Sequence, residues 1–199
     1  MRNNQDKTYR RGASCKKRYV TYPRTNSEYL ATAEQDKVKA IIEGVKKLAV
    51  TTNGIRLRQL AKPLKDAGVT AVNISLDTTD EEQYKKLTGY DGLKKVFDGI
   101  RECEKSGLSP IRLNAVLIRG QNDSQTESLI NIAKDRKIDI RFIELMPFSD
   151  EGENEKLVIK GEEILQQFPF LRPVNSSESD FEKSVARYYE AEGFKGRIG

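Results

Sequence analysis

Apolar residues along the middle of the chain follow a helical spacing and a strand-like run in alternation. The first set with the i, i+3, i+4, i+7 spacing of an amphipathic helix comprises Val38, Ile41, Ile42 and Val45. The next two helical sets comprise Leu57, Leu60, Ala61 and Leu64, then Leu93, Val96, Phe97 and Ile100. A further helix is expected around Leu129, Ile130 and Ala133, with Asp123 as its N-cap. The pattern therefore predicts four helices.

Short apolar runs lie between these helices and predict strands at residues 48–50, 71–76, 111–118 and 138–143. Gly68 and Gly107 stand where glycine commonly follows the end of a helix. Strands that alternate with helices at this spacing are joined by right-handed crossovers and form a parallel sheet. The expected fold class is therefore α/β, with functional groups at the carboxyl ends of the strands.

Polar residues occupy alternate positions of the same strands. In the second strand Asn73, Ser75 and Asp77 project from one face, opposite to an apolar face that must meet the helices. The other strands carry polar side chains in the same way, namely Arg112 with Asn114, Asp139 with Arg141, and the terminal stretch Thr51–Asn53. The polar face is expected to line a barrel lumen suited to an anionic, hydrogen-bonding ligand such as a nucleotide. The alternative is a polar layer that is satisfied internally.

The charge distribution identifies a basic N-terminal segment, and the composition does not suggest a membrane protein. The chain has 199 residues, of which 37% are hydrophobic and 33% charged, and a formal net charge of +5. No apolar run approaches the roughly 18 residues of a membrane span, so a cytoplasmic location is expected. Basic residues are concentrated before Arg24 against the single acid Asp6, which predicts a basic flexible arm over residues 1–33. A nucleic-acid-binding arm or a transit peptide is the weaker alternative.

The chain has no histidine, and its two cysteines are Cys15 and Cys103. The lack of histidine excludes imidazole acid–base chemistry, a Ser-His-Asp triad and histidine-ligated metal sites. Two widely separated cysteines do not suggest a disulfide framework. Cys103 falls on the apolar stripe of its helix and is expected to be a buried hydrophobic residue rather than a reactive thiol.

Several distinctive stretches follow one another in a characteristic order: Thr51–Gly54, Val72–Asp77, Arg112–Val116, Arg119–Asp123 and Arg141–Pro147. In this order and spacing they resemble the MoaA-type GTP 3′,8-cyclases of the radical S-adenosylmethionine superfamily. The resemblance runs from about Ile41 to Pro147 and more loosely to Gly199. It implies a lyase of molybdenum cofactor (molybdopterin) biosynthesis, which converts GTP to (8S)-3′,8-cyclo-7,8-dihydroguanosine 5′-triphosphate. The cofactors implied are S-adenosyl-L-methionine and [4Fe-4S] clusters.

The resemblance also implies roles for individual residues. Thr51 and Arg112 match positions that contact GTP, although the family usually has lysine at the place of Arg112. Arg141, from the polar face of the fourth strand, joins this GTP-binding set. The implied contacts to S-adenosylmethionine are Ser75 and Met146, and the expected supporting residues are Asn53, Asp77 and Asn114. No catalytic or metal-ligating residue is predicted.

The chain departs from the family at the iron–sulfur clusters. A four-iron cluster needs three cysteines at CxxxCxxC, but this spacing starting from Cys15 reaches Tyr19 and Tyr22. The glycine-glycine-glutamate-proline loop and the second, C-terminal cysteine cluster are also absent, so no cluster is expected on this chain. The six-stranded family core would need two further strand–helix units of roughly 30 residues each before Leu48. A partial, open radical-SAM-type β/α barrel of about four core strands is therefore expected.

Three regions are expected: the arm at 1–33, the partial barrel at 34–150 and a truncated C-terminal extension at 151–199. In the extension we expect a strand at 157–159, a helix around 162–168 and a flexible polar link at 175–180. The strand that begins at Leu48 is expected at an exposed sheet edge through which the chain can self-associate. Binding of GTP and S-adenosylmethionine is expected to be weak or lost, and neither nucleic acid nor a membrane is an expected partner.

Three functions remain open. The first is a partial GTP 3′,8-cyclase that is inactive by itself, and the second is a non-catalytic module that binds a nucleotide or S-adenosylmethionine. The third is an unrelated small-molecule enzyme on a parallel barrel, whose chemistry would depend on Asp77, Glu144 or a lysine.

Overall fold

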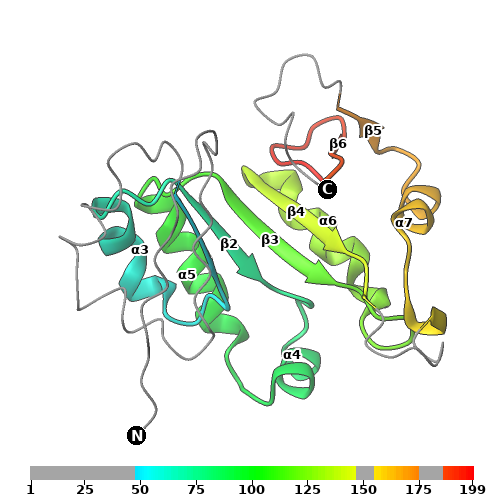
Figure 1. Ribbon diagram of the computed structural model, residues 1–199, viewed down its shortest axis with the longest axis horizontal. Helices are drawn as coiled ribbons and strands as arrows, with labels where there is room; N and C mark the ends of the chain where they lie inside the picture. The colour runs from blue at the N-terminus through cyan, green and yellow to red at the C-terminus, as the bar shows by residue number, and fades with distance from the viewer. Residues whose placement is uncertain (1–47, 147–154, 175–185) are drawn as a thin grey trace, which may run out of the picture.

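The computed structural model describes residues 48–146, 155–174 and 186–199. Its centre is a parallel sheet of four strands in the order β1-β2-β3-β4 (Figure 1). The strands are β1 (Ala49–Thr52), β2 (Ala71–Ser75), β3 (Ile111–Val116) and β4 (Ile138–Ile143). The predicted α/β class and parallel sheet are confirmed, and the described residues form an open sheet rather than a closed barrel. The predicted arm, the helix around Val38 and the link at 175–180 lie outside the described residues.

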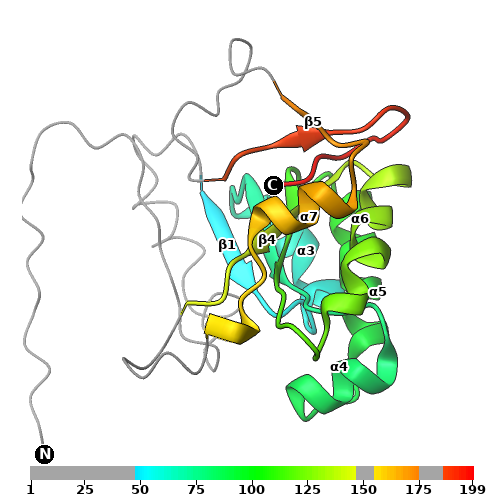
Figure 2. The same cartoon turned by 90° about the vertical axis from the view of Figure 1, so that its right-hand side faces the viewer.

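Three helices cover one face of the sheet, as Figure 2 shows from the side. They are α3 (Leu57–Asp66), α5 (Leu93–Lys105) and α6 (Thr126–Asp135). The core between the layers includes Val72, Ile74 and Leu113, each with an exposed fraction of 0%. Burial of these alternate strand residues leaves the intervening residues of β2 and β3 on the opposite face. In the described part of the chain, no helix has the length and apolar character needed to cross a bilayer.

A further helix, α4 (Glu81–Thr88), was not predicted from the sequence. Tyr84 is its one buried residue, so the segment has no apolar stripe to mark it as a helix. Its ends are specified locally instead, because the Asp80 carboxylate accepts a hydrogen bond from the Gln83 N–H at 2.7 Å. Gly89 ends the helix with φ 71°, a left-handed conformation that favours glycine.

The predicted end of the first strand and the predicted start of the helix after Asp123 are both wrong. β1 extends to Thr52, so both threonine hydroxyls belong to the strand rather than to the following loop. Asp123 does not cap α6 with its side chain, because a short 3-10 turn, Asp123–Gln125, precedes that helix. The Asp123 carboxylate instead accepts a hydrogen bond from the Gly120 N–H.

The C-terminal region contains α7 (Gly161–Gln167), which confirms the predicted helix, and a hairpin of β5 (Arg172–Pro173) and β6 (Tyr189–Glu190). The strand predicted at 157–159 is wrong. The 3-10 turn Glu155–Leu157 occupies its start, and Val158 forms an isolated antiparallel bridge with Ile118. The apolar run at 157–159 therefore contributes a single bridging residue, Val158, and does not form a β-strand.

The last residues of the chain pair with the edge of β4. The Ile140 N–H donates to the Arg197 carbonyl at 2.8 Å, and the Gly199 N–H donates to the Ile140 carbonyl at 2.7 Å. The Phe142 N–H donates to the Gly199 carbonyl at 2.8 Å. Within the described residues β1 is the other edge of the sheet, as predicted, because it pairs with β2 alone.

Candidate functional site

The face of the sheet opposite the helices carries two cross-strand rows of polar residues. The strand register places Thr51, Asn73, Arg112 and Asp139 in the first row. The same register places Ser75, Asn114 and Arg141 in the second row. The prediction that these residues share one face is confirmed, and we call this set the polar face.

Several buried polar atoms of this face have no hydrogen-bond partner in the described part of the chain. They are the side-chain oxygens of Asn73 and Asn114 and the Nε atom of Arg112. The Asn73 amide nitrogen does donate to the Thr51 hydroxyl, at 3.3 Å. A buried polar group without a partner costs about 1–3 kcal/mol, so such groups are rare unless they serve a ligand or water. Within the described residues, two acceptors and one donor of this face are therefore available to a further partner.

Positive charge accumulates on the same face. Burial lowers the pKa of the Arg112 guanidinium, and the nearby charge of Arg141 lowers it further, whereas Tyr188 and Asp139 raise it. The strand register agrees with this effect, because Arg112 and Arg141 project from the same face of the adjacent strands β3 and β4, with Arg141 two residues beyond the partner of Arg112. An anion between them would relieve their repulsion and form charge-assisted hydrogen bonds.

A third arginine on this side is already neutralised. Arg197 donates to both carboxylate oxygens of Asp139, from Nε at 3.1 Å and from NH2 at 2.7 Å. Burial lowers the pKa of Arg197, but the hydrogen bond and charge of Asp139 raise it to a net value above the ordinary one. Since the Asp139 side chain is 8% exposed and engaged in this pair, the excess positive charge remains with Arg112 and Arg141.

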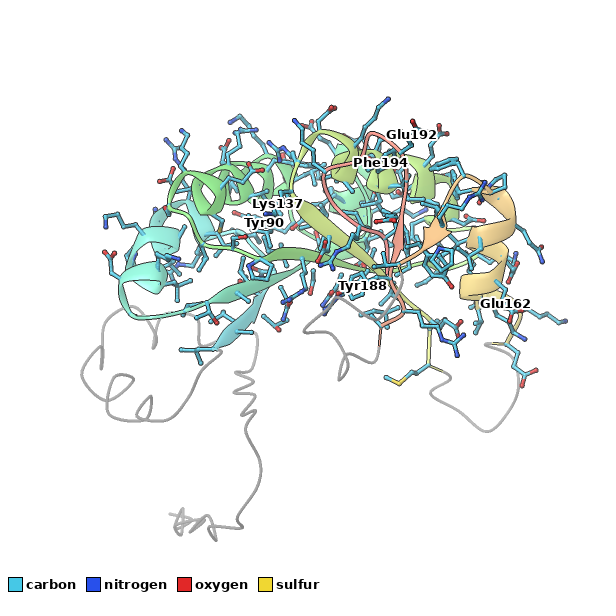
Figure 3. All side chains as sticks on the ribbon, turned by 90° about the horizontal axis from the view of Figure 1, so that it is seen from above. Tyr90, Lys137, Glu162, Tyr188, Glu192 and Phe194 are labelled. Carbon is cyan, nitrogen blue, oxygen red and sulfur yellow. The ribbon has the colours of Figure 1, made fainter. Side chains whose placement is uncertain are left out.

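Tyr188 lies on the side of the sheet away from the helices (Figure 3). Its hydroxyl accepts a hydrogen bond from Arg141 Nε at 2.5 Å. The Arg197 Cζ atom lies 4.7 Å from the centre of the tyrosine ring, and the Arg141 Cζ atom lies 5.4 Å from it. Tyr188 was not predicted as a site residue, because it is outside the strand–helix repeat and reaches Arg141 from 47 positions further along the chain.

The remaining predicted site residues occur at or just beyond the ends of the strands. Ser75 ends β2 and is aligned with Asn114 of β3. Met146 lies beyond the end of β4 and is 69% exposed. The Asn53 side chain accepts from the Ile55 N–H at 3.3 Å, within the turn that follows β1.

Asp77 and Glu144 were the carboxylates predicted for acid–base chemistry in the third of the open functions. Both accept hydrogen bonds from backbone N–H groups. Asp77 accepts from the Val116 N–H at 2.8 Å and thereby joins the ends of β2 and β3. Glu144 accepts from the Gly161 N–H at 3.0 Å, at the start of α7. These carboxylates therefore position loops at the carboxyl ends of the strands.

Cys103 is fully buried in α5, as predicted. Burial raises the pKa of its thiol to about 12, and the neighbouring Glu102 and Glu104 charges raise it in the same direction. Among the described residues, no group of three His, Cys, Asp or Glu side chains could hold a metal ion. The thiol is therefore a packing group.

We expect Cys103 to react with iodoacetamide at least about 100-fold more slowly in the native protein than in urea, because the thiolate is the reactive form. Mass spectrometry of the peptide that contains Cys103 measures this rate separately from that of Cys15. Equal labelling rates in native and denaturing buffer would contradict the buried position.

A family model matches most of the chain. The model is that of the radical SAM superfamily, and it matches residues 19–133. A solved structure with a similar fold is that of TYW1 with a lysine-pyruvate adduct bound, with a TM-score of 0.51 and 19% identity. That match covers 77% of this chain and 50% of the solved chain, and it concerns the fold alone.

Curated relatives give a closer similarity over part of their length. The GTP 3′,8-cyclase of Alkaliphilus oremlandii is 42% identical over 159 residues, which are 79% of this chain and 48% of the relative. The GTP 3′,8-cyclase of Clostridium acetobutylicum is 40% identical over 182 residues, which are 88% of this chain and 55% of the relative. The chain therefore spans about half the length of these curated relatives.

Proposed function

The chain belongs to the radical S-adenosylmethionine superfamily, and from this premise we propose that its polar face binds the GTP substrate of a GTP 3′,8-cyclase. The observation that carries the proposal is the pair of guanidiniums, Arg112 and Arg141, beside buried polar atoms that have no partner among the described residues. The similarity to enzymes named GTP 3′,8-cyclase supports the choice of GTP among anionic ligands.

Each part of the polar face suits a different part of a nucleotide. Arg112 and Arg141 would pair with the phosphates, because guanidiniums bind phosphate through charge-assisted hydrogen bonds. The orphan oxygens of Asn73 and Asn114 accept hydrogen bonds, so they suit sugar hydroxyls or an exocyclic amino group. Thr51, exposed at the sheet edge, would contribute a hydroxyl contact.

The residues present do not fit a four-iron cluster. Three cysteines are required, whereas this chain has two, and Cys103 is buried in α5 with a raised thiol pKa. No step of the proposal passes through a cluster. Without three cysteine ligands, we propose that this chain does not perform the cyclisation by itself.

S-adenosylmethionine fits the residues present better. We propose that Ser75 and Met146 would hold it, with Asn114 alongside Ser75 in register. The Asn114 oxygen, which has two lone pairs and no partner among the described residues, would also accept from a hydroxyl or ammonium group of S-adenosylmethionine. In this superfamily S-adenosylmethionine supplies the radical that begins the reaction. The task of this chain would be to hold the two ligands close together.

Calorimetric titration of the whole chain with GTP and with guanosine tests the proposal. We expect saturable GTP binding with Kd below about 1 mM, roughly −4 kcal/mol, and much weaker binding of guanosine, because the phosphates meet the arginines. GTP binding should also weaken as salt rises. Equal binding of guanosine and GTP, or no saturable binding of GTP, would refute the proposed site.

The second candidate function is a module that binds GTP or S-adenosylmethionine without catalysis, which the cysteine count favours. Anaerobic reconstitution with iron and sulfide tests the premise that this chain holds no four-iron cluster. A stoichiometric four-iron cluster would refute that premise and support a catalytic chain, whereas GTP binding without a cluster would support a chain that binds its ligand but is inactive by itself. We also propose a cytoplasmic location and self-association through the edge strand β1, which light scattering can test.

A further inference from the structure

We propose that Tyr188 is a positioning residue of the polar face, which orients the Arg141 guanidinium toward the anionic part of the ligand. The proposal rests on the proposed nucleotide site and adds a residue from the C-terminal hairpin to it. Tyr188 is 8% exposed, lies near Arg141 and Arg197, and also forms a side-chain hydrogen bond with Arg112.

The hydroxyl fixes one edge of the guanidinium. Because Arg141 Nε donates to the Tyr188 oxygen at 2.5 Å, the side chain loses rotational freedom about its long stem. The donors at the opposite end of the guanidinium then remain for a ligand. A guanidinium held by a neutral hydroxyl also keeps its full charge, which a carboxylate partner would offset.

The ring of Tyr188 lies close to both Arg197 and Arg141. The Arg197 Cζ atom lies 4.7 Å from the ring centre, and Asp139 binds the Arg197 guanidinium through both of its oxygens. Arg197 therefore holds the tyrosine ring in place, and the Arg141 Cζ atom lies 5.4 Å from the centre of the same ring. Tyr188 thus links the Asp139–Arg197 ion pair to Arg141 and limits the motion of the Arg141 side chain.

The backbone around Tyr188 is held from two directions. The Tyr188 carbonyl accepts from the Val174 N–H at 2.9 Å, and Tyr189 exchanges two hydrogen bonds with Ile198. Ile198 and its neighbours pair with β4, the strand that carries Arg141. Consequently the tyrosine and the arginine are placed by the same set of backbone hydrogen bonds.

The test compares Tyr188→Phe with the matched control Tyr189→Phe, because adjacent strand residues point to opposite faces. Calorimetry is expected to show about a tenfold weaker GTP affinity for Tyr188→Phe and unchanged affinity for the control. In the background of Arg141→Gln, adding Tyr188→Phe should cause a clearly smaller further loss, which comes from the remaining interaction of Tyr188 with Arg112. Unchanged affinity, or an equal loss in both backgrounds, would overturn the proposal.

A second measurement does not depend on GTP and so separates this proposal from the proposed function. The Arg141 Nε–H signal in a ¹⁵N NMR spectrum should exchange slowly with water in the unmodified chain and quickly in Tyr188→Phe. Thermal unfolding of Tyr188→Phe and Tyr189→Phe controls for a general loss of structure.

If the chain does not bind GTP, the proposed function fails. Slow exchange of the Arg141 Nε–H that depends on Tyr188 would still support the positioning role. Fast exchange in the unmodified chain would refute it.

Discussion

Arg112→Gln is expected to weaken GTP binding by at least about tenfold, which corresponds to roughly 1.4 kcal/mol. The substitution removes one of two adjacent positive charges and replaces a partly buried guanidinium whose Nε atom has no partner in the described part of the chain. Because burial limits the screening of this charge by water, its loss should matter more than the loss of a surface charge. Calorimetry with GTP at constant ionic strength measures the effect.

Two further variants control for this experiment. Arg112→Lys keeps the charge and should retain affinity within about threefold, although it lacks the planar fork of arginine. Arg101→Gln removes a positive charge from the outer surface of α5, where Arg101 pairs with Asp98 and is half exposed. It should leave GTP binding unchanged. If Arg101→Gln and Arg112→Gln weakened binding equally, a general effect of net charge would replace the specific site.

Gly196→Ala is expected to destabilise the attachment of the C-terminal residues to β4 by roughly 2–4 kcal/mol. A Cβ atom at this position would lie 1.9 Å from the Ile138 carbonyl oxygen and 2.8 Å from its carbon. These are backbone atoms within the sheet, so the clash can be relieved only by moving the C-terminal segment. GTP affinity should fall as well, because Tyr188 and Arg197 are held by that segment.

Urea unfolding and GTP titration of Gly196→Ala should be compared with those of Gly161→Ala. At Gly161 an added Cβ atom would meet only Glu144 Oε1, at an ordinary 3.9 Å, so the change should be close to neutral. Gly196→Ala with the stability of the unmodified chain would contradict the observed packing of the C-terminal segment on β4.

The sequence predicted the sheet and its two faces because these depend on local periodicity. Alternation of Val72 and Ile74 with Asn73 and Ser75 is enough to separate a buried face from a polar one. The helix α4 was missed because its single buried residue gives no apolar stripe. The strand predicted from the apolar run at 157–159 was wrong because its partner, Ile118, meets only Val158.

The residues of the site were predictable only in part, because some of them are placed by long-range pairing rather than by local periodicity. The polar strand positions could be placed on one face from spacing, and the register then aligns Arg112 with Asn73 and Asp139. The position of Tyr188 against Arg141 depends on pairing between the C-terminal residues and β4. Such long-range pairing has no periodic signal in a single sequence. The ligands of Thr51, Ser75 and Met146 remain proposals.

The central claim, that the polar face of the sheet binds the nucleotide, is tested most directly by NMR titration of the ¹⁵N-labelled chain with GTP. The expected result is a set of saturable shift changes at Thr51, Asn73, Arg112 and Asn114, with none at residues on the outer surface of α5, such as Glu102. Shift changes confined to the helices, or no saturable changes in the strands, would contradict the account.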